Sequence, residues 1–186
     1  MHRQYLLKQI HNYVAHNKTD IQNKQKFIDF INSRPNCFER DNDFGHITAS
    51  SWVISADESA YLLLHHRKLN IWCHPGGHCD GETNTLVVAQ KELAEEAGLE
   101  NLNLLHNGIF SLAIFNIPKY ADIPAHLHFD VTYIFKNDKA KIAKANNESY
   151  ALKWVNFAQN SLQEKHVNHL AEKSMKFLKD PKLILS

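Results

Sequence analysis

The sequence predicts an α/β sandwich. Segments rich in β-branched and aromatic residues alternate, along residues 45–160, with segments whose apolar residues recur at helical spacing. The 186 residues are 44% hydrophobic and 10% aromatic, which suffices for one ordinary core. We therefore expect a main domain over residues 45–186 and an N-terminal helical extension over residues 1–44.

The extension is expected to form a hairpin of two helices. Apolar residues at helical spacing indicate the first helix between Leu6 and Val14 and the second between Phe27 and Ile31. Asn17 is a candidate cap between them. Packing of this hairpin on the main domain is the favoured interpretation, and a homodimer contact or a gate over the site are the alternatives.

The main domain is expected to begin near Gly45. Its strands and helices are bounded by turn residues, and Gly98 stands where a helix C-cap glycine belongs. The expected strands cover residues 46–55, 60–66, 109–117, 127–135 and 151–157, and a closing helix covers residues 161–178.

A glycine-rich turn, Gly76–Glu82, precedes a helical run, Lys91–Leu99, that carries three carboxylates. Glu92, Glu95 and Glu96 stand at positions i, i+3 and i+4 and therefore share one helix face. Like charges at this spacing repel each other. A hard divalent cation such as Mg²⁺ explains the crowding, because it takes oxygen ligands and keeps waters for a phosphate substrate. A solvated acidic face is the alternative.

This arrangement resembles the Nudix hydrolase family. Its signature is Gly, five residues, Glu, seven residues, and then Arg-Glu-aliphatic-x-Glu-Glu-x-Gly-aliphatic. Anchored on Gly77, the second half falls in register, with Lys91 at the arginine position. Thr83 stands at the early glutamate position, with Glu82 one place before it. The resemblance implies the Nudix fold, a mixed sheet between helices, over about residues 45–160.

The resemblance also implies a function. It points to a Mg²⁺- or Mn²⁺-dependent pyrophosphohydrolase that cleaves the diphosphate linkage of a nucleoside diphosphate derivative by metal-activated water attack. Glu92, Glu95, Glu96 and the backbone carbonyl of Gly77 are the implied metal ligands. One of the glutamates, or Glu148 before a late tryptophan, is the implied base. ADP-ribose, a dinucleoside polyphosphate, a damaged nucleoside triphosphate and a non-nucleotide diphosphate are all candidate substrates.

Five residues are candidate substrate contacts. Two glycines let the backbone approach a phosphate closely, because they have no side chain in the way. The others offer a guanidinium or an imidazole. The five residues are Gly76, Gly77, Arg67, His126 and His128.

The segment around these histidines alternates as a strand does. His126, His128 and Asp130 share one face, and Leu127 and Phe129 share the other. The polar face could bind a transition metal, and could equally contact phosphates or a base.

Other functions stay open. A catalytically weak nucleotide-binding sensor on the same fold is one alternative. An isoprenyl diphosphate isomerase-like enzyme, with Cys73 or Cys79 acting beside a glutamate, is another. A zinc site made of Cys73, His74, His78 and Cys79 is disfavoured, because these residues crowd one turn whereas structural zinc takes two separated ligand pairs.

Charge and composition narrow the partners and the compartment. Lys and Arg number 21 against 20 Asp and Glu, a formal net charge of +1. That balance argues against a nucleic-acid or anionic-membrane surface. Three cysteines and the lack of a long apolar run favour a soluble cytoplasmic protein. The expected partner is a small molecule.

Overall fold

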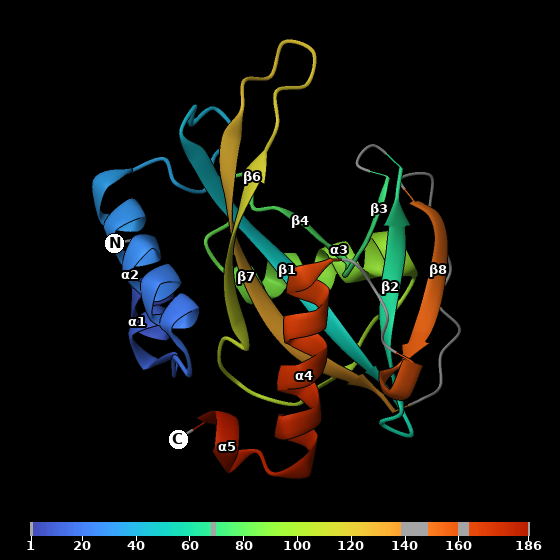
Figure 1. Cartoon of the computed structure of the whole chain (residues 1–186). Helices are drawn as coiled ribbons and strands as arrows, with labels where there is room; N and C mark the ends of the chain where they lie inside the picture. The colour runs from blue at the N-terminus through green and yellow to red at the C-terminus, as the bar shows by residue number, and fades with distance from the viewer. Residues whose placement is uncertain (1, 68–69, 139–148, 160–163, 186) are drawn as a thin grey trace.

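The computed structural model describes residues 2–67, 70–138, 149–159 and 164–185 (Figure 1). Within these residues a single sheet contains eight strands. They are β1 (Gly45–Ser55), β2 (Ala60–His66), β3 (Ile71–Cys73), β4 (Gly76–His78), β5 (Asn103–Leu104), β6 (Ser111–Ile117), β7 (His126–Asn137) and β8 (Ser149–Asn156).

The sheet is mixed. β1 and β7 pair in parallel along the whole of β1, from Gly45 opposite Leu127 to Ser55 opposite Asn137. The other strand pairs are antiparallel, with β2 and β4 beside β1, β5 and β6 beside β7, and β3 and β8 beside β2. The expectation of a mixed α/β sandwich is therefore confirmed.

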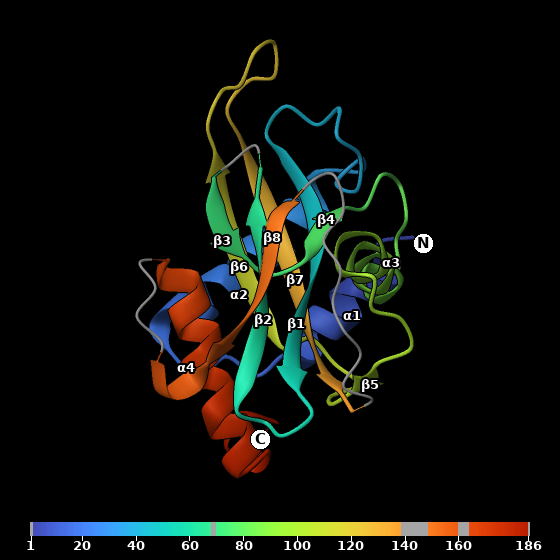
Figure 2. The same cartoon turned by 90° about the vertical axis from the view of Figure 1, so that its right-hand side faces the viewer.

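Helices cover both faces of the sheet. Apolar side chains of α1 (Gln4–Asn12), α2 (Lys18–Ser33) and α3 (Thr85–Ala97) share one core with the strands. Those of α4 (Lys165–Lys179) form a second core on the opposite face, and the short α5 (Lys182–Leu185) follows. Figure 2 shows α1 and α3 on one side of the strands and α4 on the other.

The five expected strands are confirmed to within two residues at each end. β3, β4 and β5 were not predicted, since strands of two or three residues are too short to show a period. The first helix ends at Asn12, short of the expected Val14. The closing helix is found as α4, and residues 160–163 before it lie outside the described residues.

The N-terminal hairpin packs on the sheet, as expected. The ring of Phe30 stacks on Phe129 of β7 with centroids 3.9 Å apart, and Phe27 meets the same ring edge-on at 5.2 Å. The Asn23 amide donates to the carbonyl of Leu112 in β6. Asn17 caps α2 by accepting from the backbone N–H three residues on. The expected homodimer stays a prediction.

A buried polar cluster joins this hairpin to α4. The ammonium of Lys173, a residue only 5% exposed, donates to the Tyr13 hydroxyl at 3.1 Å and lies over the Tyr13 and Phe110 rings. Burial lowers the pKa of Lys173 to about 8, although the charge of Asp20 partly opposes the shift.

Because of Lys173, the free energy of unfolding should vary with pH in the alkaline range. Between about pH 8 and the unfolded value of 10.5, the unfolded state keeps the proton that the folded state has released, so stability rises with pH. Compared with Lys173→Met, the wild type should gain up to roughly 3 kcal/mol in free energy of unfolding across this window. Urea titrations of both proteins at several pH values measure the difference, and a constant difference would contradict the assignment.

Candidate active site

The glycine strand β4 lies between β1 and α3. Its register with β1 places Gly77 opposite Ala49 and Gly76 opposite Ser50. The carbonyl of Pro75, just before β4, accepts from the backbone N–H of Ser51. On the α3 side, the Ser51 hydroxyl donates to the carbonyl of Ala89. β4 and α3 are therefore both fixed to the central strand.

Two of the three predicted glutamates converge on β4. The backbone N–H of Gly76 donates to the Glu96 carboxylate at 2.8 Å, and Glu96 is only 4% exposed. The Glu92 carboxylate lies against Gly77, so that a Cβ on this glycine would stand 2.6 Å from the carboxyl carbon. A larger residue at this position would push the Glu92 carboxylate aside. The diglycine backbone therefore lies against the glutamates of α3, and its expected close approach to a phosphate stays a prediction.

Glu95 differs from its two neighbours. It is exposed, and the Lys91 ammonium stands 3.7 Å from its carboxylate. An exposed pair of this kind contributes little to stability.

The two ends of the glutamate helix are also defined. Glu82, which stands one place before the early glutamate position, accepts a hydrogen bond from the backbone N–H of Asn84. The helix ends at Gly98, whose φ of 64° is left-handed, as expected for a C-cap.

The residues present fit a hard divalent cation. Three carboxylates stand within two turns of one helix, and two of them reach the same diglycine segment. Carboxylate and carbonyl oxygens are the ligands that Mg²⁺ and Mn²⁺ prefer. Because Gly77 has no Cβ, its backbone can lie directly beside the Glu92 carboxylate.

The sequence makes Asp130 a candidate metal ligand, but in the structure its carboxylate accepts hydrogen bonds from neighbouring hydroxyl groups. It is 3% exposed and accepts hydrogen bonds from the hydroxyls of Thr48, Ser50 and Thr132, at 2.8, 2.6 and 3.0 Å. Three donors satisfy a buried carboxylate. Asp130 therefore joins β1 to β7 through its side chain.

Four histidines gather on the same sheet face as Asp130. The register of β1 with β7 places His46 opposite His128, and its register with β4 places Thr48 opposite His78. His46 has ring centroids 4.9, 5.0 and 4.8 Å from those of His78, His126 and His128. His46 and His78 were not predicted for this cluster. The signal that could have found them is the alternation of polar residues in β1, which matches that of β7.

Three members of this cluster are neutral at neutral pH. Burial lowers the pKa of His46 and of His78 to about 4, and that of His128 to about 2. The neighbouring imidazoles and the Arg40 guanidinium add to each shift. Arg40 itself forms a bidentate ion pair with Asp80.

Arg67, a predicted substrate contact, lies on the turn after β2. Its guanidinium stands 5.1 Å from the ring centre of exposed Tyr150. Next to it, His65 stacks on Trp72 at 4.9 Å, and the Lys153 ammonium lies 3.8 Å from the Trp72 ring centre. This surface of rings and cations was not predicted. It comes from the neighbouring strands β2 and β3 together with β8, which is distant from them in sequence.

Two other predictions concern Glu148 and the thiols. Glu148 lies outside the described residues. Burial raises the pKa of Cys73 to about 12 and raises that of Cys79 as well. A thiol with a raised pKa is a poor acid or base at neutral pH. This argues against the isomerase alternative.

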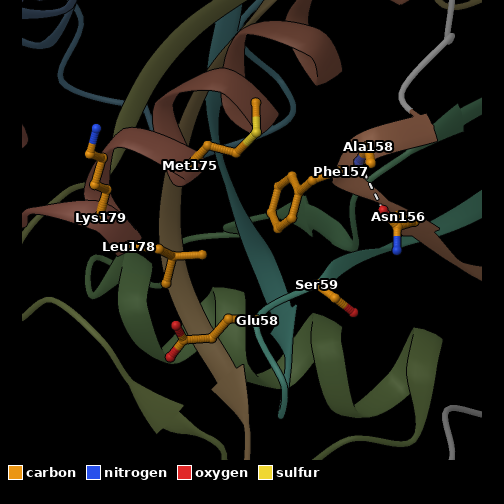
Figure 3. A pocket seen from close by; sticks show the side chains of 8 residues that line it. All are labelled: Glu58, Ser59, Asn156, Phe157, Ala158, Met175, Leu178 and Lys179. Atoms are coloured by element: carbon orange, nitrogen blue, oxygen red, sulfur yellow. Dashed lines mark hydrogen bonds between the residues drawn. The ribbon is translucent and has the colours of Figure 1, made fainter.

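A pocket of about 520 Å³ lies elsewhere, between α4 and the turn after β1 (Figure 3). Phe157, Met175 and Leu178 line it together with Glu58. His46 stands at the start of β1 and Glu58 follows its end, so the pocket and the histidines lie at opposite ends of this strand. The glutamates of α3 do not line it.

A mixed sheet between helices, with a glutamate helix held against a diglycine strand, defines the class of the Nudix proteins. The family model of the NUDIX domain matches residues 45–177, which is more than half of the chain. The chain belongs to this family. No curated protein shows significant sequence similarity to it.

Solved structures with the same fold share little sequence with this chain. The C. elegans Ap4A hydrolase has a TM-score of 0.52 at 17% identity, covering 71% of this chain and 98% of that one. The E. coli dihydroneopterin triphosphate pyrophosphohydrolase has a TM-score of 0.53 at 16% identity, covering 72% and 95%. The MutT protein of Methanosarcina mazei Go1 has a TM-score of 0.55 at 14% identity, covering 75% and 99%. At these identities the likeness shows the fold alone.

Proposed function

We propose that this chain is a Mg²⁺- or Mn²⁺-dependent pyrophosphohydrolase that cleaves the diphosphate linkage of a nucleoside diphosphate derivative. The observation that carries the proposal is the convergence of Glu92 and Glu96 on the diglycine strand. Membership of the Nudix family supports it. A cytoplasmic location and a small-molecule partner belong to the same proposal. None of the described helices has the length and apolarity to cross a membrane.

In this proposal Glu92, Glu95, Glu96 and the Gly77 carbonyl hold the cation. A bound divalent cation supplies charge neutralisation at the diphosphate and lowers the pKa of a water. Glu96, anchored on Gly76, fixes the position of α3 relative to β4. One of the three glutamates or Glu148 takes the proton of the attacking water.

The proposed substrate contacts divide by chemistry. Gly76 and Gly77 bring backbone groups to the phosphates, and contact of His126 and His128 with the substrate stays a prediction. Arg67 stands instead beside Tyr150, where rings and cations suit a base or a sugar better than a reacting phosphate.

Turnover of a panel of nucleoside diphosphate derivatives tests the proposal. The panel contains ADP-ribose, a dinucleoside polyphosphate, oxidised nucleoside triphosphates and a non-nucleotide diphosphate, each with Mg²⁺ or Mn²⁺. We expect one class to be cleaved, with activity lost on chelation and restored by adding back the ion. Tight metal-independent binding without cleavage would contradict the proposal and favour the sensor. Rearrangement of an isoprenyl diphosphate without phosphate release would favour the isomerase.

A further inference from the structure

We propose that His46, His78 and His128 form a second metal site, for a divalent transition metal of the zinc class, with His126 as an additional ligand. The potential ligand atoms of the first three lie within 4.8 Å of one another. Imidazole nitrogen is a ligand that zinc favours and that Mg²⁺ does not, so this site and the glutamate site select different ions.

The backbone holds these ligands rigidly. His46 and His128 are directly opposite each other in the parallel pair of β1 and β7. His78 is opposite Thr48, one pleat along β1 on the same face. Three hydrogen-bonded strands thus each contribute an imidazole, and the cluster does not depend on a loop.

The spacing suits tetrahedral coordination. Two nitrogens bound to zinc at 2.0–2.1 Å lie roughly 3.3 Å apart in tetrahedral geometry. The Nε2 atoms of His126 and His128 already stand 3.2 Å apart. Rotation of the imidazole rings can bring the pairs among His46, His78 and His128 from at most 4.8 Å to this distance.

His46 supplies an independent indication of a missing ligand. It is 3% exposed, and neither of its ring nitrogens has a hydrogen-bond partner among the described residues. A buried imidazole without partners loses its hydration without compensation. A metal bound at one nitrogen provides that compensation.

His126 is oriented as metal-bound histidines usually are. Its Nδ1 lies 2.8 Å from the Pro124 carbonyl, which can only accept, so Nδ1 carries the proton. Nε2 then carries the lone pair and accepts a hydrogen bond from Nε2 of His128, and a bound metal would take this lone pair in its place. A backbone carbonyl that fixes the tautomer in this way is the common outer-shell partner of a metal ligand.

β4 separates the two sites. A Cβ at Gly77 would point at Glu92, and the side chain of the next residue, His78, lies on the other face of the strand. The glutamate site and the histidine site can therefore be occupied and mutated independently.

Titration of the metal-free protein with Co²⁺, a spectroscopic probe for zinc, tests the site. We expect visible d–d absorption that saturates at one equivalent and disappears when Zn²⁺ displaces the probe. His46→Gln and His128→Gln should each weaken Co²⁺ binding by at least about 100-fold, since removing even an outer-shell partner costs 10- to 100-fold. His11→Gln, at an exposed position of α1, is the matched control and should bind as the wild type does.

Two further measurements complete the test. Glu92→Gln should keep the Co²⁺ affinity, which assigns the signal to the histidines whether or not the hydrolase proposal holds. In the wild type, Zn²⁺ should shift the imidazole NMR resonances of the four histidines, a readout that needs no variant to fold. Lack of saturable binding, unchanged binding in the His46 and His128 variants, or unshifted imidazole resonances would each overturn the proposal.

Discussion

Glu92→Gln is expected to lower kcat by about 100- to 1000-fold, the usual loss when one group that stabilises developing charge is removed. The amide keeps the size of the side chain and removes its charge. The Glu92 carboxylate lies directly against Gly77, where the cation is proposed to bind. Because the lost interaction belongs mainly to the transition state, KM should change much less than kcat. Steady-state kinetics at saturating Mg²⁺, on the substrate found by the panel, measure the effect.

Glu172→Gln is the matched control. Glu172 is exposed on α4, so kcat should stay within twofold of the wild type. Gly77→Ala tests the same contact by changing the glycine. The added Cβ would stand 2.6 Å from the carboxyl carbon of Glu92 and must displace this carboxylate. Retention of wild-type kcat by Glu92→Gln would remove this residue from the catalytic centre.

Asp130→Ala is expected to lower the free energy of unfolding by about 3 kcal/mol or more. The change removes the common acceptor of three buried hydroxyl groups, two from β1 and one from β7. Each hydroxyl would then be buried without its partner. Asp130→Asn should cost less, because the amide keeps one accepting oxygen.

Urea unfolding of the three proteins measures these differences. Asp122→Ala is the control, because Asp122 is exposed in the turn before β7 and its loss should change stability by less than about 0.5 kcal/mol. An Asp130→Ala protein within about 1 kcal/mol of the wild type would show that the three hydroxyls find other acceptors.

The long elements could be predicted because each carries a local signal. β1, β2, β6, β7 and β8 are runs of seven residues or more that are rich in apolar and β-forming residues, and β7 also alternates polar with apolar residues. The hairpin helices show apolar residues at helical spacing. β4 has three residues, two of them glycine, so its strand character comes only from pairing with β1. The glutamate helix could be predicted because its residues are close in sequence.

The histidine cluster could be predicted only in part, because its members come from three strands. His126 and His128 lie two residues apart, and the sequence grouped them with Asp130. The register then separates their roles, because it gives Asp130 three hydroxyl partners and gives His128 two further imidazoles. A one-residue shift of β1 against β7 would have turned His46 to the other face. Sequence alone does not fix that register.

The parallel pairing of β1 with β7 has a consequence for folding. Thr48 and Asp130, which are opposite each other, are 82 residues apart in the chain, whereas β6 and β7 are consecutive strands separated only by residues 118–125. Closing a long loop costs more entropy than closing a short one, so local pairings form first. We therefore expect the β6–β7 hairpin to form early and β1 to dock late. Because β4 pairs with β1 and α3 packs on both, the glutamate and histidine clusters should assemble at the end of folding, and a partly folded chain should have neither.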